Sequence, residues 1–188
     1  MAGIRVIAGS AKGKRLQMVP GEGARPITDR AKESLFNILG QYLSGASMLD
    51  LFAGTGSVGI EALSRGASQV DFIDIDRLAV KTIEANLRIT GFEDRGRVIR
   101  KDAFGWLAQT ANTPLYDLVY IAPPQYQGLW KQALLQISGN PGCLNPDAWV
   151  IAQIHPREYE QLTLHVLKEF DQRKYGSTLL VFYEWPST

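Results

Sequence analysis

A glycine-rich segment constrains the fold of this chain more than any other feature of its sequence. Gly54, Gly56 and Gly59 have the spacing GxGxxG and follow the short apolar run 47–52. In this pattern the glycines allow a sharp turn, a close approach of the backbone to a ligand, and tight packing of a helix on a strand. The amino end of such a helix offers free N–H groups to an anion. The segment therefore predicts a strand–turn–helix unit that binds a nucleoside cofactor.

Apolar runs alternate with helix-periodic segments over most of the chain. The predicted strands are 47–52, 70–75, 98–101, 116–121 and 148–154, and the predicted helices follow the glycine turn and then cover 77–90, 103–110 and 128–138. This alternation predicts an α/β, Rossmann-like fold, with a mostly parallel sheet covered by helices on both faces. The last two predicted strands, 162–170 and 178–185, flank a turn at Tyr175-Gly176, so we expect an antiparallel pair at one end of the sheet.

The first 27 residues precede this alternation and differ from it in composition. They predict two short strands and a Pro/Gly-rich loop, at 4–8, 14–19 and 20–27. Thr28 or Asp29 can cap a helix that runs to about Tyr42. We therefore expect a single domain over residues 1–188, with a basic hairpin and loop extension at 1–27 and the Rossmann-like core at 28–188.

The formal net charge of +1 conceals an uneven distribution of charge along the chain. Residues 1–33 carry seven basic and three acidic residues, whereas the remainder carries thirteen basic and sixteen acidic ones. An excess of this size is compatible with a solvated face or with a local patch for a polyanion such as RNA. Taken alone, an excess of this size favours the solvated face.

Carboxylates at the ends of the predicted strands indicate which cofactor the glycine segment binds. Asp74 ends the second strand of the core, where a carboxylate can accept hydrogen bonds from ribose hydroxyls. Asp50 lies four residues before Gly54, where it would repel the pyrophosphate of NAD and attract the ammonium group of S-adenosylmethionine. We therefore expect S-adenosylmethionine, with an NAD-dependent oxidoreductase as the alternative. Asp102 can accept from the adenine amino group, cap the helix 103–110, or do both.

A proline pair follows the predicted strand 116–121, in the order Ala122-Pro123-Pro124-Gln125-Tyr126. Ligands of open parallel sheets bind beyond the carboxyl ends of the strands. Two consecutive prolines fix the backbone and remove two N–H donors, so carbonyl oxygens can face the crevice as acceptors. Tyr126 can offer a ring face to a planar base. The alternative is a rigid turn that only ends the strand.

The chain resembles the RsmD-like 16S rRNA guanine-N2 methyltransferases. The matching segments cover nearly the whole chain, and the most specific to this family are Gly9–Leu16 and Arg25–Arg30. The glycine motif in Leu49–Gly56 also matches, but many methyltransferases share it. The resemblance implies a Rossmann-like class I methyltransferase fold and a cofactor pocket formed by Asp50, Phe52, Gly54, Gly56, Asp74, Asp102, Ala103 and Ala122. It also implies that the amino-terminal segments approach the rRNA, with Lys12, Lys14, Arg15, Arg25, Arg30 and Lys32 as candidate phosphate contacts.

The sequence departs from this family at its fourth motif, Asp/Asn-Pro-Pro-Tyr/Phe. Ala122 stands at the acidic or amide position and Gln125 at the aromatic one, while Gln153 replaces a Glu that relatives often carry. The expected catalytic group is therefore Pro123, Pro124, Gln125 and Tyr126, with the Pro123 carbonyl and Gln125 orienting the amine and Tyr126 stacking on the base. The expected activity is methyl transfer from S-adenosylmethionine to the N2 amine of a guanine in small-subunit rRNA. The alternative is a catalytically silent relative that binds cofactor or rRNA during ribosome assembly.

The remaining features narrow the surroundings in which we expect the chain to act. His155 and His165 are isolated and lack the spacing of metal ligands, so no metal is expected. No apolar run is long enough for a membrane span, and the single cysteine, Cys143, suits a reducing compartment. We expect a cytoplasmic monomer whose partner is small-subunit rRNA or an assembling ribosomal subunit.

Overall fold

The computed structural model describes residues 3–21, 26–110, 112 and 115–186. The strands in this part of the chain are β1 (Ser47–Leu51), β2 (Gln69–Asp74), β3 (Gly96–Arg100), β4 (Tyr116–Ile121), β5 (Leu144–Ile154), β6 (Lys168–Tyr175) and β7 (Thr178–Glu184). The α-helices are α1 (Asp29–Leu39), α2 (Ser57–Ser64), α3 (Arg77–Thr90), α4 (Ala103–Thr110) and α5 (Leu129–Gly139). Short 3-10 helices are η1 (Gly40–Leu43), η2 (Pro141–Cys143) and η3 (Pro156–Glu158).

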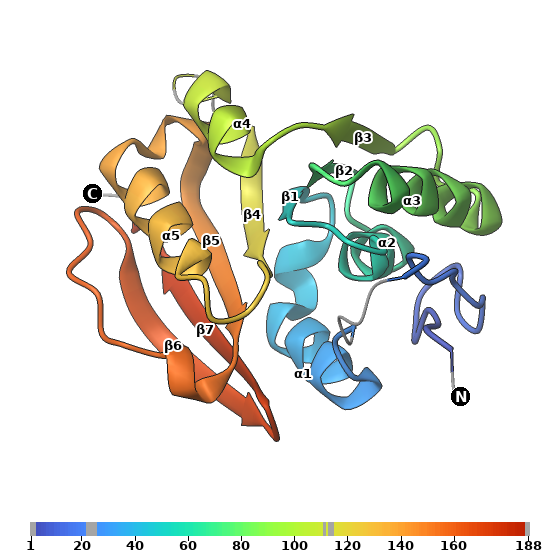
Figure 1. Ribbon diagram of the computed structural model, residues 1–188, viewed down its shortest axis with the longest axis horizontal. Helices are drawn as coiled ribbons and strands as arrows, with labels where there is room; N and C mark the ends of the chain where they lie inside the picture. The colour runs from blue at the N-terminus through green and yellow to red at the C-terminus, as the bar shows by residue number, and fades with distance from the viewer. Residues whose placement is uncertain (1–2, 22–25, 111, 113–114, 187–188) are drawn as a thin grey trace.

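All seven strands form one sheet in the order β3-β2-β1-β4-β5-β7-β6 (Figure 1). Strands β1 to β5 are parallel, and β7 lies antiparallel between β5 and β6. The predicted parallel sheet and its closing antiparallel pair are confirmed. The strand order reverses between β1 and β4, where Asp50 pairs with Tyr120 across the two strands. Connections leave the two strands in opposite directions, which opens a crevice at their carboxyl ends.

Two apolar layers cover the two faces of the sheet. One cluster contains buried side chains of α1, α2 and α3 together with four from the amino-terminal extension, Ile4, Val6, Ala11 and Leu16. The other cluster contains buried side chains of α4 and α5, so both faces of the central strands are covered, whereas the edge strand β6 is largely exposed. Both faces of a parallel sheet must be buried, and this explains the near-continuous apolar runs of β1, β2 and β4. No helix of the described ranges is long and apolar enough to cross a membrane.

Several boundaries differ from those that the sequence predicted, among them the start of β5, which lies at Leu144 rather than at 148. Helix α1 ends at Leu39 rather than near Tyr42, because Gly40 adopts a φ of 47° and the chain continues as the 3-10 helix η1. The strand predicted at 162–170 is wrong, since β6 begins at Lys168 and pairs with β7 up to the turn. In the extension, the two predicted strands reduce to a single antiparallel bridge between Arg5 and Arg15.

Glu61 on α2 holds the extension and α1 against the core. Its side chain is fully buried and accepts hydrogen bonds from the backbone N–H groups of Ile7, at 2.8 Å, and Ala8, at 3.0 Å. It also pairs with Arg65 at 2.8 Å and with Lys32 at 3.5 Å. A buried carboxylate is stable only with such a complete set of partners. Glu61 therefore fixes the chain on either side of the segment that precedes α1.

The structure overturns the prediction that Lys32 contacts RNA phosphate. Lys32 is 1% exposed, and its ammonium group donates to the Arg5 carbonyl oxygen at 2.7 Å besides pairing with Glu61. Burial lowers the pKa of this ammonium group, and the Glu61 carboxylate opposes that effect. The helical period of α1 places Lys32 on the inner face of the helix, whereas its neighbour Glu33 is exposed.

Replacement of Glu61 by alanine should strongly destabilise the fold. The change leaves the buried Lys32 ammonium group without its counter-charge and two backbone N–H groups of the extension without their acceptor. Loss of one partner of a buried ion pair costs about 3–5 kcal/mol. Urea unfolding should show this decrease in the free energy of unfolding. The matched change Glu84→Ala, at an exposed position of α3, should cost less than about 0.5 kcal/mol, and equal effects of the two changes would contradict this role of Glu61.

Candidate active site

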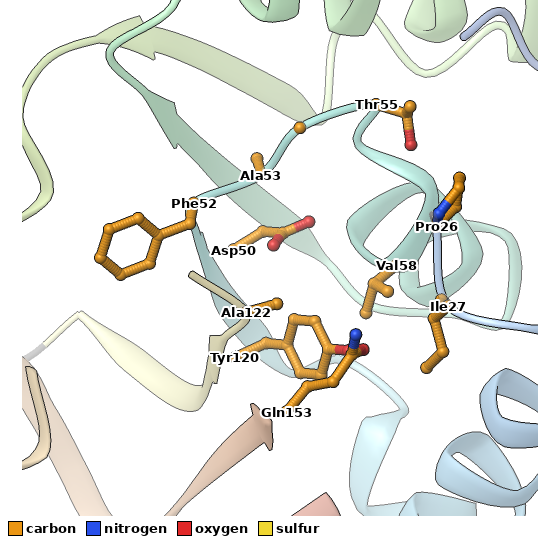
Figure 2. A pocket seen from close by; sticks show the side chains of 11 residues that line it. Pro26, Ile27, Asp50, Phe52, Ala53, Thr55, Val58, Tyr120, Ala122 and Gln153 are labelled. Atoms are coloured by element: carbon orange, nitrogen blue, oxygen red, sulfur yellow. The ribbon is translucent and has the colours of Figure 1, made fainter. Parts of the chain in front are cut away.

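A cavity of about 120 Å³ lies at the carboxyl ends of β1, β4 and β5, where the strand order reverses (Figure 2). Its lining residues come from four parts of the chain and are Pro26, Ile27, Asp50, Phe52, Ala53, Gly54, Thr55, Val58, Tyr120, Ala122 and Gln153. Pro26 and Ile27, from the segment before α1, lie across the cavity from Asp50 and Tyr120. The extension therefore closes one side of the cavity.

The glycine segment forms the turn between β1 and α2 that the sequence predicts. Gly54 has a φ of 57°, and a Cβ atom there would meet no other atom within 4 Å, so this side of the loop is open to a ligand. Gly59 faces the opposite way, since a Cβ atom there would lie 2.3 Å from the Phe72 ring. Gly56 has a φ of 75° and starts α2. The three glycines thus have separate roles: Gly54 leaves the ligand side open, Gly56 forms the turn that starts α2, and Gly59 lets the helix pack closely on the strand.

Asp50 places a carboxyl group inside the cavity with few compensating partners. It is 2% exposed, and its Oδ2 atom accepts one hydrogen bond, from Gly59 N–H at 3.1 Å. Burial raises the pKa of Asp50 to about 8, and the nearby Asp74 carboxylate adds to the shift. An ionised carboxylate at this position needs a cation beside it. The site therefore fits a ligand that brings a positive charge, as the ammonium group of S-adenosylmethionine does, and disfavours a pyrophosphate.

Asp74 and Asp102 lie at the predicted strand ends and support the backbone of the loops around them. Asp74 accepts from Gly54 N–H at 2.8 Å and thereby fixes the open turn of the glycine segment. Asp102 accepts from Gly105 N–H at 2.8 Å, which confirms its expected role as a cap of α4. Both carboxylates lie outside the lining of the cavity, as do Gly56 and Ala103. Their contacts with ribose and adenine stay predictions.

The residues of the proline turn after β4 differ in their exposure to solvent. Pro123 is buried, whereas Pro124, Gln125 and Tyr126 are exposed and lie outside the cavity lining. Tyr126 has a φ of 61°, a strained value for a tyrosine.

The turn is held by Glu158 of η3. Its carboxylate accepts from Tyr126 N–H at 2.7 Å and from His155 N–H at 3.1 Å. The Tyr126 ring lies beside the His155 ring, with centroids 5.5 Å apart. The catalytic roles of Pro123, Pro124, Gln125 and Tyr126 stay predictions, and the geometry shows a rigid, outward-facing turn.

The predicted phosphate contacts lie on the extension and on the first turn of α1. Lys12, Lys14, Arg15 and Arg30 are exposed, and the Lys14 ammonium group donates to the Ile89 carbonyl oxygen of α3 at 2.8 Å. Arg25 lies outside the described residues. With Lys32 buried, four of the six predicted phosphate contacts are available on the surface.

The sequence analysis did not assign two residues that form or support the site: Tyr120 lines the cavity, and Asn86 supports the glycine segment. Tyr120 lies in the cavity wall and donates to Gln153 (Figure 2). Asn86 on α3 donates to the Thr55 carbonyl oxygen at 2.9 Å and exchanges two hydrogen bonds with Gln17, so it ties the extension to the glycine segment. The strand alternation that puts Tyr120 on the same face as Ala122 was a usable signal for Tyr120.

The described residues contain no group of three or more His, Cys, Asp or Glu side chains that could hold a metal ion.

The strand order, the glycine turn and the buried carboxylate at the reversal of the sheet define a Rossmann-like class I methyltransferase, the class that uses S-adenosylmethionine.

Comparison with known proteins identifies the family. The model of the family described as conserved hypothetical protein 95 matches residues 4–184, and the chain belongs to this family. It is 38% identical over 183 residues to the candidate rRNA methyltransferase YlbH of Bacillus subtilis, covering 96% of this chain and 98% of that protein. It is 36% identical to ribosomal RNA small subunit methyltransferase D of Haemophilus influenzae, over 80% and 78% of the two chains. A solved structure of the candidate methyltransferase yhhF from Escherichia coli has a TM-score of 0.85 at 32% identity, with full coverage of both chains. These matches confirm the resemblance inferred from the sequence motifs.

The affinity for a cationic ligand should depend on pH through Asp50. The groups around this carboxyl group are Gly59 N–H, the Asp74 carboxylate and the Tyr120 hydroxyl. None of these groups is a cation that could balance the charge of the ionised Asp50. The ligand must bind the ionised form, whose population falls about tenfold for each pH unit below a pKa of about 8. Calorimetry with S-adenosylhomocysteine, which keeps the ammonium group, should show Kd falling as the pH rises from 6 to 8.

The variant Asp50→Asn is the control, because it keeps an acceptor for Gly59 N–H but does not ionise. Its Kd should be higher than that of the wild type at pH 8 and almost constant between pH 6 and 8.

The raised pKa of Asp50 also makes the unliganded protein less stable as the pH rises from 3.8 toward about 8, since the folded state holds a proton that the unfolded chain releases. A pH-independent Kd of the wild type would contradict this view of Asp50.

Proposed function

We propose that this chain transfers a methyl group from S-adenosylmethionine to the N2 amine of a guanine in 16S rRNA. The observation that carries the proposal is the buried Asp50 carboxyl group in the cavity at the reversal between β1 and β4. A carboxyl group with this environment suits a cationic cofactor and disfavours a pyrophosphate. The relatives named as rRNA and small-subunit rRNA methyltransferases support rRNA as the substrate.

Each expected part of the cofactor has residues suited to hold it. Asp50 would pair with the ammonium group, and Asp74 keeps lone pairs for ribose hydroxyls while it holds Gly54. Asp102 and Ala103, at the start of α4, would meet the adenine ring, and the open side of Gly54 lets the cofactor approach the backbone closely. Phe52, Gly56 and Ala122 would complete the surface against it. Pro26 and Ile27 would exclude water from the opposite side.

The reaction requires positioning more than acid–base chemistry. When bound, S-adenosylmethionine supplies a sulfonium methyl group, which the amine lone pair takes as the carbon–sulfur bond breaks, its electrons staying on sulfur and the surplus amine proton passing to water. The amine lone pair of guanine is delocalised into the ring, so acceptors that hold both N–H hydrogens must aim it at the methyl carbon. Such orientation can lower the barrier by several kcal/mol. We assign one acceptor to the Pro123 carbonyl and a stacking surface to Tyr126 on the rigid turn with Pro124.

The exposed cations of the extension would hold the rRNA backbone. Lys12, Lys14 and Arg15 are exposed on the extension, and Arg30 is exposed on the first turn of α1. Pro26 and Ile27, which lie between them in the chain, line the cavity. Phosphate contacts of this kind position RNA without reading its sequence. Arg25 belongs to the same predicted set. With so few contacts, the shape of the assembled small subunit would supply most of the specificity.

A second candidate function is favoured by one residue. Ala122 offers no side-chain acceptor at the position where the family carries Asp or Asn. A silent relative that binds cofactor and rRNA without methyl transfer would tolerate this change. Both candidate functions require binding of the cofactor and of rRNA, and only the first includes methyl transfer.

The proposed reaction predicts labelled methyl transfer to unmodified small subunits. Subunits from a strain that lacks the corresponding methyltransferase should take up tritium from labelled S-adenosylmethionine, and nucleoside analysis should find N2-methylguanosine. Asp50→Asn should lower kcat/KM at least tenfold, a loss of about 1.4 kcal/mol, because the cofactor loses its counter-charge.

Glu84→Ala, which lies away from the cavity on α3, serves as the control and should retain full activity. Measurable cofactor binding without any incorporation would reject the proposed transfer and favour the silent relative. Incorporation into another nucleoside would reject only the guanine-N2 assignment.

A further inference from the structure

Gln153 lies beside Ala122 on the neighbouring strand, in the wall of the cavity. Strands β4 and β5 are parallel, and their register pairs Tyr120 with Ile151 and Ile121 with Ala152. The next pair in this register joins Ala122 to Gln153. Paired residues of adjacent strands point to the same face of a sheet. Ala122 and Gln153 therefore share the face that carries Asp50, and both line the cavity.

The amide of Gln153 is held in place by Tyr120. The Tyr120 hydroxyl donates to Gln153 Oε1, and Figure 2 shows the two groups in contact within the cavity wall. Tyr120 is 2% exposed, and burial raises the pKa of its hydroxyl well above the usual value. The hydroxyl thus stays protonated and remains a donor at every working pH. An amide oxygen has two lone pairs, so Gln153 Oε1 keeps one for a ligand.

The sequence analysis assigned the missing acceptor to Gln125, and the structure offers a better placed one. Gln125 is exposed on the outward-facing turn and lies outside the lining of the cavity. Within the described part of the chain the Gln125 side chain has no hydrogen-bond partner that would fix it, whereas Gln153 is fixed by Tyr120. A group that must aim a lone pair has to be pre-oriented. Ala122 and Gln153 both line the cavity, and the short side chain of Ala122 fills little of it.

We propose that Gln153 is the side-chain acceptor that orients the substrate amine, in place of the acidic or amide group that Ala122 lacks. The assignment rests on the proposed methyl transfer. Gln153 Oε1 accepts one amine N–H, and the Nε2 group donates to an adjacent ring nitrogen. A planar amide pairs in this bidentate way with nucleobases that carry an amine next to a ring acceptor. Guanine presents this combination at N2 and N3, so Gln153 also contributes to the choice of base.

The variant Gln153→Leu tests this role, because leucine is similar in length and has no acceptor. We expect kcat for methyl transfer to fall ~100-fold, the size of effect that misplacement of a reacting group produces. The Kd for S-adenosylhomocysteine should stay within about twofold, which also shows that the variant folds. Gln127→Leu is the matched control, since Gln127 is an exposed glutamine next to the proline turn and lies outside the lining of this cavity. Its kcat should equal that of the wild type.

A rescue experiment separates an orienting role from a structural one. Ala122→Asn places an amide beside position 153 from the adjacent strand. The double variant Ala122→Asn/Gln153→Leu should therefore have a kcat at least fivefold higher than that of Gln153→Leu. Tyr120→Phe should lower kcat to a smaller extent, because Gln153 is then present but no longer fixed.

The outcomes distinguish this assignment from the reaction on which it rests. An active wild type with a fully active Gln153→Leu variant overturns the role of Gln153 alone. Loss of kcat in Gln125→Leu rather than in Gln153→Leu also overturns it and restores the acceptor to the turn. A wild type that binds cofactor without turnover overturns both proposals together.

Discussion

The reversal of strand order between β1 and β4 is the constraint on which the site depends. Two parallel strands whose connections leave in opposite directions cannot be covered at their carboxyl ends by the same helix, so a crevice remains there. Asp50, Tyr120 and Gln153 all face this crevice from neighbouring strands, and the glycine turn borders it. The cavity is therefore a consequence of the sheet topology, and the side chains decide only what it binds.

Two buried polar side chains attach the amino-terminal extension to this crevice. Glu61 joins the extension and α1 to α2, and Asn86 joins Gln17 to the Thr55 carbonyl in the glycine segment. The contacts with the extension connect residues more than 50 positions apart in the chain. Because the buried groups lose their water, each must keep its protein partners, and this fixes the path of the chain. The extension thereby holds Pro26 and Ile27 at the cavity.

Much of the fold could be predicted from local pattern, and the site only in part. The alternation of apolar runs and helical segments is a short-range property, so it gave the parallel sheet and the antiparallel end pair. The strand at 162–170 was misplaced because its apolar residues pack against the second core layer without joining a ladder. Lys32 was misjudged for a similar reason. A lysine in a basic segment suggests an exposed residue, while its burial depends on Glu61, which lies on another helix.

The sequence by itself determined the fold class, the glycine turn, and the acidic residues at the strand ends, because each depends on the local spacing of residues along one element. Only the tertiary structure decided which of these groups share a cavity. Asp50 faces the cavity while Asp74 and Asp102 support loops, and Gln153 rather than Gln125 stands in the wall. The physical reason is that burial and hydrogen-bond partners are set by strand register and by contacts between distant segments, neither of which is encoded in the spacing of neighbouring residues.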